Sequence, residues 1–464
     1  MTPRLSALLL ALVLAGCASA PVIDASAIVA TPAAFKEGEG HWTVAAPADA
    51  QPRGEWWKAF ADPVLDGLVE RAGRDNASVQ IAAARLAQAR ALLGSVDADR
   101  SPQLGVGAGA VRQSDTTTGR VPATLISAGA TLSYELDVFG RLSSESKAAA
   151  LDVHAREALL QSARLMAQAD VAQSYFALRA LDIERNILRD TTTAYRNTLR
   201  LVERRFDAGD VAELDVARVR TELAATESEA LALDARRATL EHAIAVLVGE
   251  PASRFAIGPA AWQAALPGVP AGVPSTVLAR RPDVAAAMHQ LKAAQARVGA
   301  AQAAWFPSVS LTAAGGFASP ELSDVFKWSA RTWGIGALLS LPVLDGGRRR
   351  SAVDAARAEF ELGVAGYRES VLVAFKEVED ELASLRLLAE QAQAQSRAIA
   401  SAARATALSE SRYRNGLVSQ LDLLDAQRSE LRSRRQAIQV QSAQYQATIG
   451  LIRALGGAWE GGKG

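Results

Sequence analysis

An internal duplication limits the possible folds of this 464-residue chain more than any other feature of its sequence. The chain repeats itself at an offset of about 206 residues, far longer than the period of a solenoid repeat. Residues 206–215 and 413–422 share an aromatic residue, a glycine, a valine and a Leu-Asp pair. The sequence therefore predicts two copies of one plan, each with the order helix, strand, loop, strand, long helix, turn and helix.

Each copy contains a proline-free segment long enough to form one very long helix. The first segment runs from 141 to 207 and the second from about 348 to 414. At 1.5 Å per residue, each would form a helix about 100 Å long. Apolar residues recur at helical spacing, so such a helix has to bury a stripe against a partner. We expect antiparallel hairpins with helices at 211–248 and 417–455, which makes the fold class mainly α.

Four shorter segments alternate between apolar and small residues, at about 102–112, 124–136, 307–316 and 333–343. Strands of about 10 residues suit a membrane barrel, although the edge of a soluble β-sandwich shows the same alternation. Beyond the N-terminus, no stretch approaches the roughly 20 apolar residues of a transmembrane helix. Four strands cannot close a barrel, and open edges are not tolerated in lipid. The pattern therefore predicts an oligomer, with eight strands from two chains or twelve from three.

The first 16 residues have the features of a secretory signal peptide, because Arg4 precedes an apolar run that is too short to span a bilayer. The run ends in Leu14-Ala15-Gly16-Cys17, which is similar to the lipobox where bacterial lipoproteins are cleaved and acylated. Cys17 is the only cysteine, so an intramolecular disulfide is excluded. The expected parts are a signal peptide at 1–16, a lipidated segment at 17–61, a first repeat at 62–248, a linker at 249–275, a second repeat at 276–457 and a tail at 458–464.

Composition and motifs argue against nucleic-acid binding and against catalysis. The 50 basic and 50 acidic residues leave no net charge to attract a polyanion. We find no combination of a nucleophile with an acid–base group. The histidines are scattered without metal-ligand spacing: His41, His154, His242 and His289. We therefore expect no enzyme activity, no cofactor and no bound metal.

A series of motifs resembles those of the TolC/OprM-type outer-membrane factors, in particular the NodT-like lipoprotein branch that serves RND efflux pumps. The motifs are Glu55-Trp56-Trp57, Asp62-Pro63 and the segments 135–141, 269–274, 280–284, 305–307, 342–348 and 454–459. The resemblance covers essentially all of the mature chain. It implies a lipid-anchored homotrimer in the outer membrane, with a twelve-stranded barrel continuous with a long periplasmic α-helical barrel. It also implies two protein partners, a periplasmic adaptor (membrane fusion protein) and an inner-membrane RND transporter.

A passive duct of this kind needs a gate, and the turn at Gly416 is followed by residues suited to one. Helical spacing puts Leu421 and Asp425 on one face, with Asp422 beside it. In a threefold assembly each residue becomes a ring of three, and acidic rings favour cations. The matching positions constrict the periplasmic end in members of the family. The alternative is an ordinary helix cap at Ser419, because acidic residues in a first turn are favoured by the helix dipole.

The two tip turns are also expected to contact neighbouring tips and the adaptor. Asp215, Arg412 and Tyr413 are candidates for links between neighbouring tips. This sequence differs from the family pattern here, because the positions of the locking arginine and threonine of TolC-like members hold Val418 and Leu214. The expected adaptor surface consists of Gly209, Val211, Gly416, Leu417 and Val418, flanked by Arg204, Arg205 and Ser419.

Taken together, the sequence favours the exit duct of a tripartite RND-type pump that passes drugs or other small solutes. Two alternatives stay open. A structural lipoprotein could span the periplasm without conducting, which would explain Cys17 and the long helices but not the duplicated amphipathic hairpins. The same channel could instead serve a type I secretion system, and only the lipobox resemblance favours the efflux branch.

Overall fold

The computed structural model describes residues 23–24, 28–37, 54–114, 122–260, 262, 266–269, 277–278 and 280–457. The predicted signal peptide, the predicted lipidation site Cys17 and the tail at 458–464 lie outside these ranges. Within the ranges, no helix is both long enough and apolar enough to cross a membrane.

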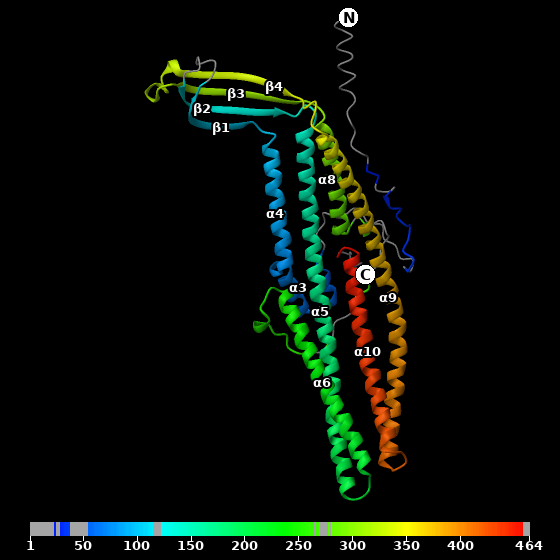
Figure 1. The fold of residues 1–464 in the computed structure, drawn as a ribbon. Coiled ribbons are helices and arrows are strands. Elements are labelled where there is room, and N and C mark those ends of the chain that lie inside the picture. The colour runs from blue at the N-terminus through cyan, green and yellow to red at the C-terminus, as the bar shows by residue number, and fades with distance from the viewer. Residues whose placement is uncertain are drawn as a thin grey trace. The chain divides into compact units, whose positions relative to one another are not determined.

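The secondary structure repeats with equal helix lengths in the two halves (Figure 1). The first half contains α4 (Ala77–Ala98), β1 (Gln103–Gln113), β2 (Ala123–Leu136), α5 (Arg141–Asp207) and α6 (Glu213–Leu247). The second contains α8 (Pro282–Ala303), β3 (Ser308–Ser319), β4 (Arg331–Ser340), α9 (Arg348–Arg414) and α10 (Gln420–Ala454). Both long helices have 67 residues, and both partner helices have 35. The predicted order is confirmed, but β4 ends at Ser340 rather than near 343, because Pro342 has no amide to continue the pairing.

Contacts divide the chain into two compact units that do not coincide with the two sequence copies. Unit 1 consists of residues 1–30, 84–157 and 286–369, and unit 2 of residues 31–83, 158–285 and 370–464. Each copy therefore contributes segments to both units. The sequence repeat describes how the chain is built, and the compact units describe how it packs.

The sheet of unit 1 has four antiparallel strands in the order β1-β2-β3-β4. The pairing of β2 with β3 joins the two halves and places Gly129 opposite Gly316. A Cβ atom on Gly316 would lie only 2.4 Å from the carbonyl oxygen of Ala128, so the close approach requires glycine. Strands β1 and β4 form the edges, and both are exposed along their whole length.

An aspartate just before each long helix caps its first turn. The carboxylate of Asp137 accepts hydrogen bonds from the amides of Leu142 and Ser143, at 2.9 and 2.7 Å. The carboxylate of Asp345 accepts hydrogen bonds from the amide and Nε of Arg349, at 3.2 and 2.7 Å. These contacts satisfy amides that every helix leaves unpaired at its N-terminus. Asp137 and Asp345 therefore set where α5 and α9 start.

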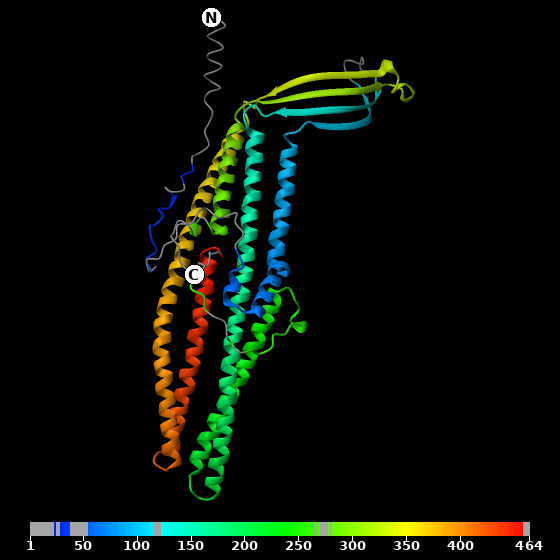
Figure 2. The same cartoon turned by 180° about the vertical axis from the view of Figure 1, so that it is seen from behind.

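In unit 2, α5 and α6 form one antiparallel hairpin, and α9 and α10 form another. Figures 1 and 2 show the two turns at the same end. A short 3-10 helix, η1 (Trp56–Phe60), and α3 (Pro63–Asp75) pack against these helices in the main core cluster. The buried ring of Phe60 lies 5.0 Å from that of Phe176, which lies 4.6 Å from Tyr445. The Trp-Trp motif therefore belongs to a core that holds both hairpins.

Candidate functional site

The two hairpins end in turns of the same construction. Gly209 has a φ of 82° and Gly416 a φ of 71°, a left-handed conformation that glycine adopts without strain. In each turn, the amide that follows the glycine bonds to a carbonyl five residues earlier: Asp210 to Arg205 at 2.8 Å and Leu417 to Arg412 at 2.9 Å. These bonds satisfy carbonyls at the helix end, so each glycine fixes where its long helix stops.

The turn residues predicted to meet an adaptor differ in exposure. Leu417 is 72% exposed. Val211 and Val418 are half-buried, and Val211 packs against the apolar cluster beneath the tips. The second turn therefore presents the larger apolar side chain to solvent.

Asp422 forms the helix cap that the sequence left as an alternative. Its carboxylate accepts hydrogen bonds from the amide and the hydroxyl of Ser419, at 2.9 and 2.7 Å, while its amide donates to the same hydroxyl. The hydrogen bond from the Ser419 side chain lowers the pKa of Asp422. Asp422 therefore stays ionised at the start of α10, where a negative charge is favoured.

Leu421 and Asp425 share the exposed face of α10, as the helical spacing predicted. Leu421 is 39% exposed, whereas Leu424 is fully buried in the cluster beneath the tips. Asp425 Oδ1 lies 3.2 Å from Nη1 of Arg428, whose second amino group pairs with Glu222 of α6. The hydrogen bond with Glu222 raises the pKa of Arg428, so the guanidinium stays charged. Asp425 is therefore an exposed carboxylate, and Arg428 beside it is also held by Glu222.

The structure places the three candidates for tip links in different environments. Tyr413 joins the two hairpins, because Arg205 donates a 3.2 Å hydrogen bond to its hydroxyl and lies 5.6 Å from its ring centre. Asp215 instead pairs with Arg218 on its own helix, at 3.5 Å. Arg412 contributes its backbone carbonyl to the second turn. Arg205 with Tyr413 is therefore a contact between the two tips within one chain, and Arg205 had been expected on the adaptor surface.

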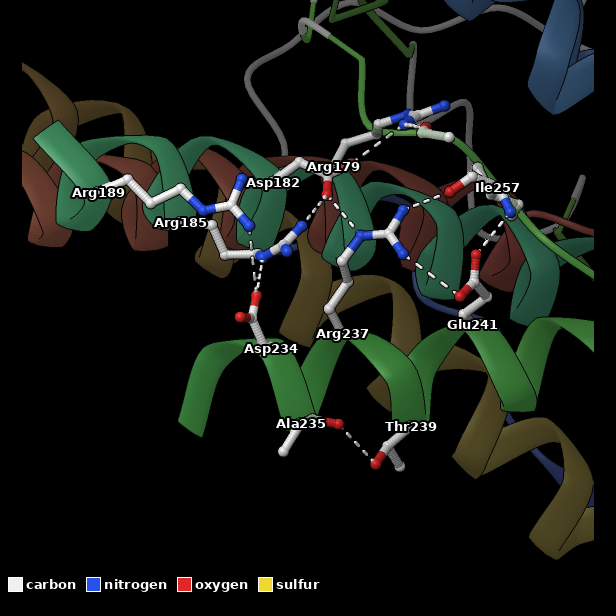
Figure 3. Close-up of polar contacts among 11 residues, drawn as sticks. Arg179, Asp182, Arg185, Arg189, Asp234, Ala235, Arg237, Thr239, Glu241 and Ile257 are labelled. Atoms are coloured by element: carbon white, nitrogen blue, oxygen red, sulfur yellow. Dashed lines mark hydrogen bonds and ion pairs between the residues drawn. The ribbon is translucent and has the colours of Figure 1, made fainter. Parts of the chain in front are cut away.

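A buried ionic cluster was missed by the sequence reasoning, which expected an apolar stripe at the buried face of α5. Three arginines converge on Asp182, whose side chain is 1% exposed (Figure 3). The distances to its oxygens are 3.1 Å from Arg179, 3.6 Å from Arg185 and 2.7 Å from Arg237. Buried charges need such pairing, since an isolated one would be strongly unfavourable. The signal was present, because Asp182 and Arg185 interrupt the apolar stripe between Leu178 and Leu188.

The same cluster binds the chain that follows α6. Arg179 donates a 2.8 Å hydrogen bond to the carbonyl of Gly258, and Arg237 donates one to the carbonyl of Ile257. The amide of Ile257 donates to Glu241 at 2.6 Å (Figure 3). Three charged side chains therefore hold the backbone at 257–258 across α5 and α6.

The described ranges contain no group of three side chains suited to hold a metal ion. The sequence treated the histidines as unrelated, but the fold brings His154 of α5 and His289 of α8 within 5.5 Å, measured between ring centres. Nδ1 of His154 lies 3.1 Å from a carboxylate oxygen of Glu157. The contact between the rings of His154 and His289 joins the two sequence copies within unit 1.

The comparison with known proteins points to a single family. Residues 68–250 and 273–457 match the family described as outer membrane efflux protein. The chain is 34% identical over 408 residues to the solvent efflux pump outer membrane protein SrpC of Pseudomonas putida, covering 86% of each chain. It is 32% identical over 458 residues to the cation efflux system protein CusC of Escherichia coli O6:H1, covering 97% of each chain. The solved outer-membrane channel OprN matches with a TM-score of 0.86 and 31% identity, over 96% of this chain and 100% of that chain.

Proposed function

Because the chain belongs to the outer membrane efflux protein family, we propose that it is the outer-membrane exit duct of a tripartite RND-type efflux pump. The family consists of efflux ducts rather than enzymes, and its location is the outer membrane. The duct passes drugs or other small solutes from a periplasmic adaptor and an inner-membrane transporter to the exterior. The observation that carries the proposal is the second hairpin tip, which presents Leu421 and Asp425 on an exposed face directly after the turn.

A homotrimer would complete the sheet. Strands β1 and β4 each pair on one side only in the described part of the chain, and their other edges carry unpaired backbone groups. Lipid offers no hydrogen-bond partners for such edges. Pairing of β4 in one copy with β1 in the next satisfies them, and three copies give a closed sheet of twelve strands that is wide enough for a pore.

A substitution at Asp425 tests the proposed gate. Replacing it with alanine removes three carboxylates from the constriction of a trimer, so we expect higher single-channel conductance and lower cation selectivity in planar bilayers. Arg428 keeps its pairing with Glu222, so the substitution leaves no unpaired cation. Unchanged conductance and unchanged selectivity would remove Asp425 from the gate.

Asp354→Ala is the matched control for this measurement. Asp354 is also an exposed aspartate of a long helix, with its side chain 60% exposed and a loose 4.0 Å contact to Arg350. It lies near the start of α9, about 60 residues and roughly 90 Å from the tip. The control removes the same charge without changing the tip, and we expect wild-type conductance and selectivity.

The assembly and its anchor are tested together. We propose that Cys17 is acylated and that the mature protein is a trimer in the outer membrane. Native mass spectrometry of detergent-extracted particles should show three chains, and the mature N-terminal peptide should begin with a lipidated Cys17. A stable single chain would leave the sheet edges unpaired and would favour a tether that does not conduct.

A further inference from the structure

A groove lies between the two hairpins, above the tip turns. It has a volume of about 330 Å³ and is lined by α6, α10 and one residue of α5. The α10 side contributes three arginines at positions i, i+4 and i+7, which share one helix face. The residue from α5 is Tyr195. The charged residues of the lining are Arg428, Arg432, Arg435, Glu222 and Glu229.

Two of the three arginines are neutralised by acidic partners from the first hairpin. Arg428 pairs with Glu222, and Arg435 pairs with Glu229 at 2.7 Å and with Glu184 at 2.7 Å. Arg432 lies between them and has neither an ion pair nor a hydrogen bond with any residue that the structure describes. Arg432 is therefore the one arginine of the lining whose guanidinium has no partner in the described part of the chain, and it is a free donor.

A second donor without a partner comes from the opposite side of the groove. The side chain of Tyr195 is 2% exposed, and its hydroxyl has no hydrogen-bond partner in the described part of the chain. Burial raises the pKa of Tyr195, so the hydroxyl keeps its proton and remains a donor. A buried polar group without a partner costs free energy, which a ligand that accepts a hydrogen bond would recover.

We propose that this groove binds a small oxyanion, a carboxylate or phosphate group of a solute, held between Arg432 and Tyr195. Both free groups are donors, and Arg432 is a cation, so the ligand has to be an acceptor with negative charge. Because Tyr195 belongs to α5 and Arg432 to α10, the bound anion bridges the two hairpins. Its occupancy would stabilise the hairpins in the arrangement seen here.

Titration of the purified full-length protein with inorganic phosphate, at constant ionic strength maintained with chloride, tests the site. We expect the Tm to rise with phosphate and to define an apparent Kd. Arg432→Gln should raise that Kd at least about tenfold, because a charge-assisted hydrogen bond is lost. Tyr195→Phe removes only the hydroxyl and should weaken binding by a smaller factor. Acetate in place of phosphate shows whether carboxylate-bearing solutes are bound as well.

Arg434→Gln is the control, since Arg434 lies on the same helix, pairs with Glu430 and does not line the groove. It should keep the wild-type response. No phosphate response in the wild type, or an equal response in Arg432→Gln, would overturn the site. A response that survives Tyr195→Phe unchanged would overturn the bridge between hairpins. The binding measurement does not depend on conduction, so its failure leaves the proposed duct untested and intact.

Discussion

The two helical hairpins have the same lengths but are held by different chemistry. Both consist of a 67-residue helix, a glycine turn and a 35-residue helix, at an offset of 207 residues. The charged residues in and around the ionic cluster of the first hairpin have mostly neutral counterparts in the second. Asp182, Arg185, Asp234, Arg237 and Glu241 correspond to Ala389, Ala392, Gln441, Gln444 and Thr448. The duplication therefore preserved the geometry of the hairpin while its buried ionic cluster exists in one copy.

Arg179 has an arginine counterpart in the second copy, Arg386, and each holds a segment from outside its hairpin. Arg179 binds the carbonyl of Gly258, in the chain that follows α6. Its counterpart Arg386 pairs with Glu37 at 2.7 Å, in the segment near the N-terminus. In both hairpins an arginine of the long helix therefore holds a segment from outside the hairpin.

The second hairpin binds its outside segment with backbone contacts and an aromatic ring. The carboxylate of Glu379 accepts hydrogen bonds from the amides of Lys36 and Glu37, at 2.6 and 2.9 Å. Phe35 is 3% exposed and lies against Phe375, with 6.4 Å between ring centres. The first hairpin therefore adds a buried ionic cluster to its aromatic contacts, whereas the second holds its outside segment by one ion pair, backbone hydrogen bonds and the ring of Phe35.

The largest expected effect is on the first hairpin. Asp182→Ala leaves the surrounding arginines without their shared carboxylate, and breaking a buried ion pair typically costs about 3–5 kcal/mol. Hydrogen exchange should become faster in α5 and α6 near the cluster and stay unchanged in the distal part of α9 and α10.

Gln444→Ala is the matched change in the second hairpin, at the position equivalent to Arg237. Gln444 donates one long hydrogen bond, 3.4 Å, to the carbonyl of Leu388, so its loss should cost about 1 kcal/mol or less. Equal effects of Asp182→Ala and Gln444→Ala would show that the buried charges do not distinguish the two hairpins.

The next effect concerns the second hairpin alone. Phe35→Ala removes a buried ring and should weaken docking of the N-terminal segment by up to about 3 kcal/mol. We expect faster hydrogen exchange in α9 near Phe375 and Glu379, with the first hairpin unchanged. Lys36→Ala is the control, because the amide of Lys36 makes the contact and its side chain is 87% exposed. Equal hydrogen exchange in the two variants would show that the ring of Phe35 does not contribute to docking of the N-terminal segment.

A smaller effect is expected where the two hairpins meet at their tips. Tyr413→Phe removes the hydrogen bond from Arg205 but keeps the ring, whereas Arg205→Gln removes both contacts. Each contact at such a half-exposed site is worth about 0.5–1 kcal/mol. Hydrogen exchange at the two turns should increase in the order wild type, Tyr413→Phe, Arg205→Gln. If Arg205→Gln leaves exchange at the second turn unchanged, the hairpins are independent at their tips.

The sequence predicted the elements of this fold because their causes are local. Proline-free segments with helical spacing gave the long helices, and Gly209 and Gly416 marked turns that need a positive φ. That Leu421 and Asp425 share one face of their helix followed from helical spacing alone. These features depend on residues close in sequence, so a single chain without relatives is enough to find them.

The contacts between elements could not be predicted in the same way. The position of Asp182 among three arginines depends on which face of α5 meets α6, and that face is set by packing in three dimensions. The pairing of Tyr413 with Arg205 joins residues 208 apart, and no local pattern specifies it. Asp422 was ambiguous for another reason, since an acidic residue in a first turn suits both a cap and a charged ring.

The smallest expected effect is on the pH dependence of stability. The second hairpin has a titrating carboxyl at a position where the first hairpin has none. Glu381 of α9 lies against Gly450 of α10, and burial raises its pKa above the ordinary value of 4.5. The equivalent residues of the first hairpin are Ser174 and Ala243, which do not titrate. Because the folded state binds the proton more tightly than the unfolded state, this carboxyl lowers stability as pH rises from about 4.5 through its raised pKa.

Glu381→Gln should therefore reduce the loss of protection in α9 and α10 between pH 4.5 and pH 7, as measured by hydrogen exchange corrected for its intrinsic pH dependence. Burial also raises the pKa of Asp170 on α5, so a pH response by itself does not identify the group responsible. Asp170→Asn supplies the comparison, because it removes the carboxyl of Asp170 and leaves Glu381 in place. If Glu381→Gln leaves the pH dependence of the second hairpin as in the wild type, the carboxyl is solvated in solution and the two hairpins do not differ at this position.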